Sequence, residues 1–305
     1  MNRREFVFYI ALGLFISGCQ KPKGRKGYRI EVQEGESLVL IDNITGASFY
    51  LHKNATLDLN GYTINGNDPK EAKKVHQAIT AHSGASVLNG TIEGYINGIS
   101  VVSELADGYL DALKLVSKKQ AKNIGDKYRN ENQGGAKIIN VDIDGCVSHA
   151  VYFQAFTTDS IIDGCIFNDT GLMHIYVDHG CEGHSIQNSS FFRCGFSHWK
   201  GREGIALDSC VDIVVGNNLF EGRMKLRAIS AYTNKGENSI TREICRGHKI
   251  KNNVFRNLRE GVGLASRGNY CENVELIENR FENVGLPFFD KGEGNIISNN
   301  IAINR

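Results

Sequence analysis

The sequence has few prolines and little helical periodicity, and both absences are compatible with a protein made of β-strands. It contains only three prolines, and from about residue 136 onward almost no apolar residues recur at helical spacing. The apolar run Phe6 to Ile16 is too short to span a bilayer as a mature helix. A net charge of +1 gives no general reason to expect a nucleic-acid partner. No two cysteines follow the C-x₂-C spacing of a zinc site.

A degenerate repeat fills the chain from about Ala136 onward. Each copy holds short alternating strands, such as SIIDGCIF and HIYV. An aromatic marker returns after 25, 28, 35 and 26 residues, at Phe167, Phe192, Phe220, Phe255 and Phe281. A copy this short cannot bury its own apolar face and must stack on its neighbours. The pattern predicts an all-β solenoid, a right-handed parallel β-helix, over residues 28–305 as one domain.

Asparagines stand at the same place in successive copies, just before the apolar pair: Asn217-Asn218, Asn252-Asn253, Asn279 and Asn299-Asn300. Stacked amides can hydrogen-bond along a ladder at the strand spacing of about 4.8 Å, and asparagine tolerates the left-handed backbone of a sharp turn. We expect such a ladder rather than a set of unrelated surface turns. His184 and His248 begin strands in matching positions and are expected to have a stacking role.

The N-terminus has the features of an export signal. Asn2-Arg3-Arg4 leads into the apolar run and then into Ser17-Gly18-Cys19. Ile-Ser-Gly-Cys resembles the lipobox of bacterial lipoproteins, which implies that residues 1–18 are removed, that Cys19 carries lipid and that residues 19–27 form a tether. Gln20 after this cysteine favours an outer-membrane lipoprotein, periplasm-facing or surface-exposed. An ordinary signal followed by a chance cysteine is the alternative, and Arg3-Arg4 leaves Sec and twin-arginine export open.

Seven further cysteines would meet the oxidising compartment that this signal predicts. Cys146 and Cys165 fall at matching places in adjacent copies, DGCV and DGCI. They could stack as thiols or form a bridge, and the spacing favours neither arrangement.

Residues 103–132 change character. The segment is charged, and Ala106, Tyr109, Leu110, Leu113 and Val116 recur at helical spacing. We expect a helical insertion at about 104–135 that projects from one turn of the solenoid. It would lie on a functional face, where repeat proteins tend to carry insertions, or would cover an open end of the solenoid.

The chemistry is expected on one outward-facing column. Six segments align after the turn of each copy: HAVYFQA, MHIYVDH, EGIALDS, RAISAYT, EGVGLAS and GLPFFDK. Alternation predicts that one set faces inward: Val151/Phe153, Ile175/Val177, Ile205/Leu207, Ile229/Ala231 and Val262/Leu264. The outward set is then Tyr152, Gln154, His174, Tyr176, Asp178, Ala206, Asp208, Ser230 and Tyr232, with His179, Ser209 and Arg267 just past the strands.

Asp178 and Asp208 hold equivalent places in adjacent copies, so their carboxylates should lie about 5 Å apart. Two like charges at that distance repel by about 3 kcal/mol at an effective dielectric constant of about 20. They are expected to share a proton, to recruit a cation or to face a basic group, with Arg202, Lys200 and Arg267 as basic candidates. Two carboxylates alone make a poor calcium cage, so Ca²⁺ is allowed but no metal or other cofactor is required.

His179 directly follows Asp178 and could give or take a proton at neutral pH. Tyr176 could act as the opposite acid or base if a neighbouring arginine lowered its pKa. The plainer interpretations are a structural histidine at a strand end and a tyrosine that only stacks on sugar. His174 and His149 are expected to pack at the strand start.

These repeats, together with LDLNGYTING near the start, resemble the pectate-lyase-like parallel β-helix superfamily over roughly residues 28–305. That group contains polysaccharide lyases, hydrolases and uronate C5-epimerases, and the resemblance implies a glycan groove along one outer sheet. Tyr176-x-Asp178-His179 with Asp208 one coil on is similar to the active site of mannuronan C5-epimerases, although no proline stands between Asp178 and His179. By that resemblance His179, Tyr176, Asp178, Asp208 and Arg202 are catalytic, and the substrate-binding residues are Gln154, Tyr152, His174, Lys200, Tyr232 and Arg267.

Three functions follow from the sequence. The first is an enzyme that abstracts the C5 proton of a uronate in an acidic polysaccharide and completes the reaction as a lyase or as a C5-epimerase. The second is a non-catalytic lipoprotein that binds a polysaccharide or serves its assembly or export. The third is a glycoside hydrolase that uses Asp178 and Asp208. The fold alone does not decide between them, and the oligomeric state is left open.

Overall fold

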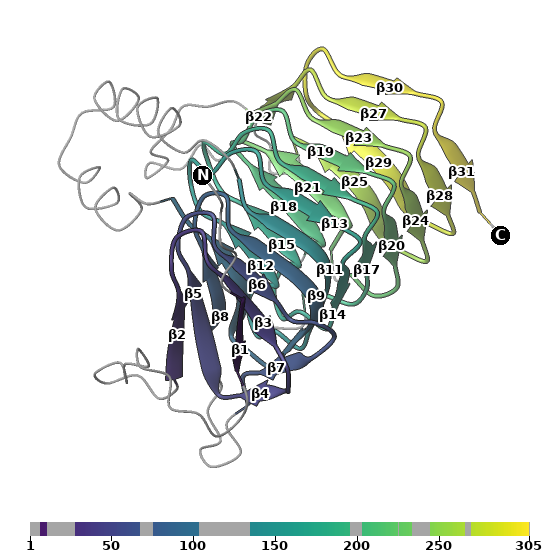
Figure 1. Ribbon diagram of the computed structural model, residues 1–305. Helices are drawn as coiled ribbons and strands as arrows, with labels where there is room; N and C mark the ends of the chain where they lie inside the picture. The colour runs from purple at the N-terminus through teal and green to yellow at the C-terminus, as the bar shows by residue number, and fades with distance from the viewer. Residues whose placement is uncertain are drawn as a thin grey trace.

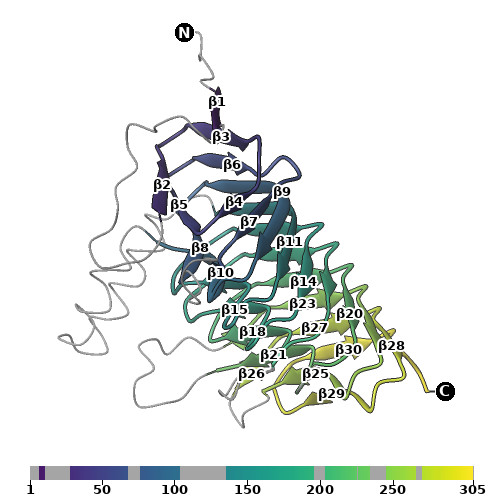
Figure 2. The ribbon, with the colours of Figure 1, turned by 90° about the horizontal axis from the view of Figure 1, so that it is seen from below.

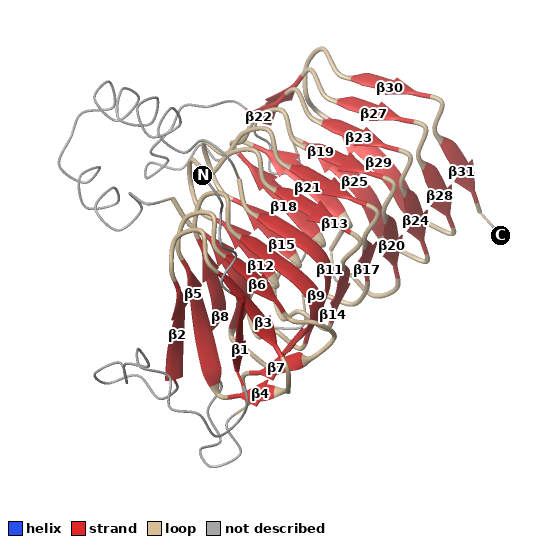
Figure 3. Cartoon of the chain, in the orientation of Figure 1, coloured by secondary structure: helices blue, strands red, loops and turns tan. Residues whose placement is uncertain are grey.

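The computed structural model is a stack of coils that runs from the N-terminal to the C-terminal end (Figures 1 and 2). It describes residues 7–10, 28–67, 76–103, 135–195, 203–224, 226–233, 245–265 and 270–304. In these residues the secondary structure consists of strands and turns, with no helix, and neighbouring strands pair in parallel (Figure 3). The predicted parallel β-helix is confirmed.

One face of the coils forms a ten-stranded sheet, which we call the site sheet. Each strand hydrogen-bonds to the equivalent strand of the next coil, so residues at equivalent positions form columns along the solenoid. Its strands, in spatial order, are β2 (Tyr28–Val32), β5 (Ala47–Leu51), β8 (Gln77–Ala81), β10 (Asn97–Val101), β12 (Val151–Phe153), β15 (Ile175–Val177), β18 (Ile205–Asp208), β21 (Ile229–Tyr232), β25 (Glu260–Leu264) and β29 (Leu286–Asp290).

The other faces form a 19-stranded sheet that bends around the core. Two long strands, β9 (Ser86–Glu93) and β11 (Lys137–Asp144), each pair with two short strands of a neighbouring coil and so join two columns of strands. The remaining strands of this sheet are β1 (Val7–Ile10), β3 (Ser37–Leu40), β4 (Ile44–Thr45), β6 (Thr56–Asp58), β7 (Thr63–Asn65), β13 (Ile161–Asp163), β14 (Ile166–Asn168), β16 (Ser185–Gln187), β17 (Ser190–Phe191), β19 (Val214–Gly216), β20 (Leu219–Glu221), β23 (Lys249–Lys251), β24 (Val254–Arg256), β27 (Glu275–Ile277), β28 (Arg280–Glu282), β30 (Ile296–Ser298) and β31 (Ile301–Ile303). A separate pair consists of β22 (Cys245–Arg246) and β26 (Cys271–Glu272).

Phenylalanine rings stack along the interior, one in each of five successive coils. Neighbouring ring centroids lie 4.6 to 5.0 Å apart, and the ring planes are within 12° of parallel. The members are Phe167, Phe191, Phe220, Phe255 and Phe281. The repeat marker that the sequence placed at Phe192 is wrong by one residue, because β17 puts Phe191 in register with Phe167 and Phe220.

The predicted asparagine ladder is confirmed. The amide nitrogen of Asn218 donates to the amide oxygen of Asn253 at 3.1 Å, and this contact repeats from Asn253 to Asn279 and from Asn279 to Asn300, each at 3.0 Å. All but the last are fully or almost fully buried. The residue before each of these asparagines adopts the left-handed backbone, with φ between 55° and 57°. The ladder therefore supplies the turn and also satisfies the buried polar groups beside it.

Replacing Asn253 with alanine is expected to lower the free energy of unfolding by about 3 kcal/mol. The substitution removes the acceptor for the backbone and side-chain N–H groups of Asn218, and the donor to the carbonyl of Val215 and to Asn279, all inside the core. Urea titration measures the change, with Asn304→Ala at an exposed position as the control. Equal midpoints for the two variants would contradict a structural role for the ladder.

Seven cysteines fall within the described residues, and all are buried free thiols. Cys146 and Cys165 do not form a bridge. The matching positions expected from the sequence are wrong, because the register of β11 with β14 places Cys165 beside Val141, whereas the carbonyl of Cys146 accepts the backbone N–H of Gly171. The predicted signal peptide, lipidated Cys19, tether and helical insertion lie outside the described residues, apart from their edges and β1, which pairs with β3. The described part of the chain contains no helix that is long and apolar enough to cross a membrane.

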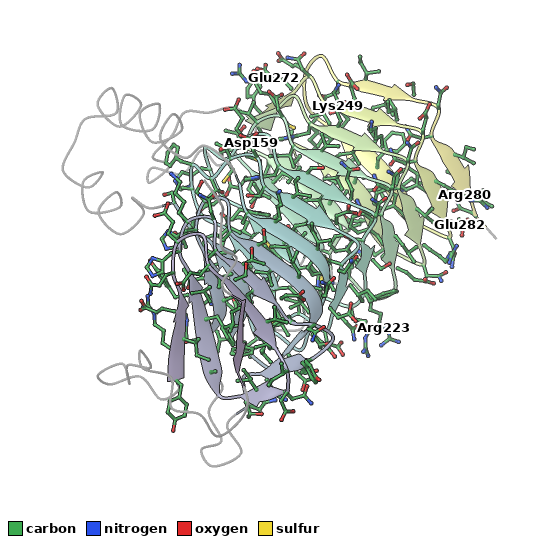
Figure 4. The ribbon with its side chains drawn as sticks, viewed as in Figure 1. Asp159, Arg223, Lys249, Glu272, Arg280 and Glu282 are labelled. Carbon is green, nitrogen blue, oxygen red and sulfur yellow. The ribbon has the colours of Figure 1, made fainter. Side chains whose placement is uncertain are left out.

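Charged side chains lie on the outside of the coils, including the labelled Arg280 and Glu282 at the C-terminal end (Figure 4). Arg256 lies 2.7 Å from Glu282 and 3.6 Å from Glu221, and Arg280 also contacts Glu282. Exposed pairs of this kind contribute little to stability. The fold is stabilised mainly by the buried stack of phenylalanine rings and by the asparagine ladder.

Candidate active site

The candidate site lies on the outward face of the site sheet, at its middle strands β12, β15 and β18. The register pairs Tyr152 with Tyr176 and Val177 with Leu207, so Asp178 and Asp208 follow at equivalent positions in adjacent coils. The inward set predicted from alternation is confirmed, since all ten residues are at most 1% exposed: Val151, Phe153, Ile175, Val177, Ile205, Leu207, Ile229, Ala231, Val262 and Leu264.

Two tyrosine hydroxyls connect the two carboxylates. Tyr152 donates to Oδ2 of Asp178 at 2.6 Å. The hydroxyl of Tyr176 lies 3.0 Å from Oδ2 of Asp208 and 3.4 Å from Oδ1 of Asp178, so it bridges the two acids. The two tyrosine rings stack with centroids 5.5 Å apart. The predicted proximity of Asp178 and Asp208 is therefore confirmed. The group between the two carboxylates is the Tyr176 hydroxyl.

His179 is held by the residue before it. Its Nδ1 lies 2.6 Å from Oδ1 of Asp178, and its backbone N–H donates to the same oxygen at 2.8 Å. The ring of Phe156 meets the imidazole edge-on with centroids 5.9 Å apart. A neutral His179 that donates from Nδ1 carries its lone pair on Nε2, which is the tautomer of a general base.

The surroundings shift the pKa values of Asp178 and Asp208 in opposite directions. Burial works to raise the pKa of Asp178, but the hydrogen bonds and charge of His179, together with the Tyr152 hydroxyl, hold it below its ordinary value. Burial and the negative charge of Asp178 raise the pKa of Asp208, although Ser209 and Tyr176 donate hydrogen bonds to it. The two carboxyls therefore differ, because the pKa of Asp178 is held below its ordinary value and that of Asp208 is raised above it.

Both tyrosines are proton donors in this environment. Burial and the charge of Asp178 raise the pKa of Tyr152, and burial with the charges of Asp178 and Asp208 raises that of Tyr176. The suggestion that an arginine lowers the pKa of Tyr176 is not supported by the described residues. Tyr176 therefore keeps its proton at neutral pH and is not available as a base.

Sequence reasoning gave His149 only a packing role at the strand start, but the structure brings it to the site. Its ring lies 5.8 Å from the ring of Tyr152 and 5.6 Å from that of Tyr176, and its Nδ1 is 2.9 Å from the hydroxyl of Ser148. Burial lowers the pKa of His149 to about 4, against the opposing charge of Asp178. A neutral imidazole therefore forms one wall of the site.

Two predicted substrate-binding residues are not on the surface. His174 is completely buried, with Nδ1 2.8 Å from the Thr170 hydroxyl and Nε2 against the carbonyl of Phe192. Its prediction as outward-facing is wrong, because the strand start turns it into the core, whereas its expected packing role is confirmed. Tyr232 is 2% exposed and packs with Met173 and Ala206 against Tyr176. It lies beside Asp208 in the neighbouring coil and is covered instead of facing solvent.

Gln154 is half-buried and follows β12 as Asp178 follows β15. Arg202, Lys200 and Arg267, the predicted basic residues, lie outside the described residues, so their roles stay predictions. Within the described ranges no group of three or more His, Cys, Asp or Glu side chains could hold a metal ion.

Replacing Asp208 with asparagine is expected to raise the melting temperature at pH 7 by about 2 °C. A carboxyl with a raised folded-state pKa stabilises the fold below its unfolded pKa and loses that contribution as pH rises through the folded value, so its charge is a cost at pH 7. Calorimetry at pH 7 and pH 6 measures the effect, which should be smaller at the lower pH because more of Asp208 is then protonated. A lower melting temperature at both pH values would contradict the assigned shift.

The family of the chain follows from a match to a family model. The model described as "Right handed beta helix region" matches residues 129–302, more than half of the 305 residues. The chain belongs to this right-handed β-helix family. The predicted handedness and fold class are thereby confirmed. No curated protein matches the chain.

Several solved structures share the fold at low identity. The catalytic domain of a GH87 alpha-1,3-glucanase in complex with nigerose is 10% identical with a TM-score of 0.45, and the match covers 92% of this chain and 64% of that one. An alginate lyase from Paenibacillus sp. str. FPU-7 is 12% identical with a TM-score of 0.44, covering 90% and 93%. The periplasmic alginate epimerase AlgG is 10% identical with a TM-score of 0.41, covering 90% and 78%. Such likeness concerns the fold alone.

Proposed function

We propose that this right-handed β-helix protein abstracts the C5 proton of a uronate residue in an acidic polysaccharide and acts as a lyase or a C5-epimerase. The observation that carries the proposal is the 2.6 Å contact between Nδ1 of His179 and Oδ1 of Asp178. An ionised carboxylate at Nδ1 fixes the tautomer that leaves Nε2 as a base and stabilises the imidazolium formed when it takes a proton.

The neighbouring groups supply the other requirements of the reaction. Removal of H5 puts negative charge on C5 and the C6 carboxylate, and that charge must be stabilised. Asp208 in its protonated form can donate a hydrogen bond to the carboxylate, and Arg202, Lys200 and Arg267 are the cations that we assign to the same task. Tyr176 then donates the second proton, to C5 from the opposite face in epimerisation or to the departing O4 in elimination.

A second candidate is glycoside hydrolysis. The observation that favours it is the opposite direction of the two pKa shifts, since the pKa of Asp178 is lowered and that of Asp208 is raised. An acid and a carboxylate in one site are the two groups that glycosidases use. Here, however, both carboxyls contact the same Tyr176 hydroxyl, on one side of the sheet, and Asp178 is already engaged by His179 and Tyr152. The arrangement therefore suits proton abstraction by His179 better.

Incubation of the protein with a panel of uronate polysaccharides in D₂O, followed by proton NMR, tests the proposal. New alkene signals mean elimination, and deuterium at C5 without cleavage means epimerisation. New reducing ends without either signal mean hydrolysis and would replace the proposal by the second candidate. His179→Ala should be inactive, while His76→Ala, at an exposed turn, should keep full activity. A panel without any product, or an active His179→Ala, would contradict the proposed chemistry.

We further propose that the protein is a lipoprotein of the outer membrane, anchored through lipid on Cys19. The basis is the Ile-Ser-Gly-Cys sequence after the short apolar run. Cys19→Ser should move the protein from the membrane fraction to the soluble fraction and abolish labelling by a radioactive fatty acid. Membrane association that survives this substitution without any label would contradict the anchor.

A further inference from the structure

A column of cysteines runs through the interior directly behind the turn that follows the site strands. Paired residues in successive coils place Cys181, Cys210, Cys245 and Cys271 in register. Each is completely buried. Thr157 heads the column, with its hydroxyl 3.3 Å from the sulfur of Cys181. Four thiols in consecutive coils is a chemical feature that the proposed function does not use.

The sulfur atoms of Cys245 and Cys271 are in direct contact, and the side chain of Cys245 also interacts with Cys210. Cys245 and Cys271 are partners in the β22–β26 pairing, and their sulfur atoms lie 3.6 Å apart. Neighbouring strands are about 4.8 Å apart, which falls within the Cα separation that a disulfide spans. Rotation of two side chains would therefore bring the sulfurs to bonding distance without moving the backbone.

His248 adds a donor to one of these sulfurs. Its Nδ1 accepts the backbone N–H of Ile213 at 3.1 Å, so the neutral ring carries its hydrogen on Nε2. That nitrogen is 3.0 Å from the sulfur of Cys245. An N–H donor of this kind stabilises a thiolate, which is the form that attacks a disulfide. This contact distinguishes the sulfur of Cys245 from that of Cys271.

We infer that Cys245 and Cys271 form a disulfide when the chain folds in contact with a disulfide oxidant. The two thiols lose two protons and two electrons as the sulfur–sulfur bond forms, and a small-molecule disulfide accepts them and becomes two thiols. The bond would join two successive coils at their turns. This inference does not depend on the proposed polysaccharide chemistry.

The stage of folding at which the bond forms follows from burial. The hydrogen bond to Cys245 and burial raise the pKa of Cys271, and burial raises the pKa of Cys245. Both thiols are therefore protonated and shielded from an oxidant once the coils have closed. Exchange belongs to the period in which the C-terminal coils are still assembling.

The experiment refolds the full chain from denaturant in oxidised and reduced glutathione, alkylates remaining thiols after an acid quench, and maps the unreduced peptides by mass spectrometry. We expect one linked pair that contains Cys245 and Cys271, lighter by two hydrogen atoms than the separate peptides, with the other cysteines alkylated. Complete alkylation of all cysteines would overturn the inference, and so would a link between Cys245 and Cys210.

Two variants test which cysteines form the disulfide and whether the disulfide stabilises the folded chain. Cys271→Ser should abolish the link. Cys210→Ser should retain it, because Cys210 lies in the coil before Cys245 and is not part of the pair. Oxidised wild-type protein should melt about 5 °C above Cys271→Ser treated in the same way, and a reducing thiol should remove that difference. A link that persists in Cys271→Ser, or is lost only in Cys210→Ser, would show that the pair is wrongly assigned.

Discussion

Lowering the pH from 7 to 5 is expected to reduce the free energy of unfolding by about 6 kcal/mol. His174, His184 and His248 are completely buried, and burial lowers the pKa of each to about 3. They stay neutral in the folded chain but take up protons near pH 6.5 in the unfolded chain. Stability is therefore lost as pH falls through the unfolded value, by about 2 kcal/mol for each histidine at pH 5.

A loss of this size is comparable to the whole stability of many domains, so unfolding by acid is expected near pH 5. Urea titrations at pH 7 and pH 5, followed by circular dichroism, measure the difference. Equal stability at the two pH values would mean that these imidazoles are protonated in the folded chain.

The chain provides a matched control for one of these histidines. His184 and His248 each accept a backbone N–H through Nδ1, from Ser160 and Ile213, and further along the column the side chain of Asn295 does the same for Val274. His248→Asn keeps an acceptor at this position but cannot titrate. It should recover about 2 kcal/mol of the loss at pH 5. An unchanged pH dependence would assign the acid sensitivity to other groups.

Replacing Asp178 with asparagine is expected to lower turnover by about 10³-fold. An amide that donates to Nδ1 of His179 would favour the tautomer with hydrogen on Nε2, and that tautomer cannot take a proton there. The neutral amide would also cease to stabilise the imidazolium. Because Tyr152 can still donate to the amide oxygen, the fold should persist.

Initial rates on the substrate found by NMR, with circular dichroism as a check on folding, measure this effect. Asp163→Asn is the control, since Asp163 lies on the other sheet, where it accepts the side-chain amide of Asn188 at 2.7 Å. Both variants should fold, and only Asp178→Asn should lose activity. Full turnover in Asp178→Asn would remove His179 from the role of base.

The sequence was sufficient for those parts of the fold that depend on local periodicity. Alternation identified the inward residues of the site sheet, and the position of Asn253 before an apolar pair identified the ladder. The error at Phe192 arose because two phenylalanines stand side by side. Only the register of β17 with its neighbours decides which of the two enters the core.

Most residues of the candidate site were predicted from the sequence, but the hydrogen bonds between them were not. Asp178 and Asp208 could be aligned because the two coils are similar in length. The bond from Tyr152 to Asp178 crosses coils and depends on side-chain rotamers, which leave no signal in the spacing. His174 was misplaced because the regular alternation does not hold at the strand start, where its ring turns toward Phe167 and Phe191 in the core. Tyr232 was expected to be exposed because alternation gives the side of a strand but says nothing about what covers it.

The register of the site sheet also determines where the molecule is most resistant to local opening. In a solenoid each coil touches only its two neighbours, so a coil inside the array is clamped by two interfaces and a coil at the margin by one. Strands β12, β15 and β18 have four strands of the same sheet before them and three after them. The geometry of the candidate site is thus carried by coils that are held from both sides, and thermal fraying at either margin would leave it intact.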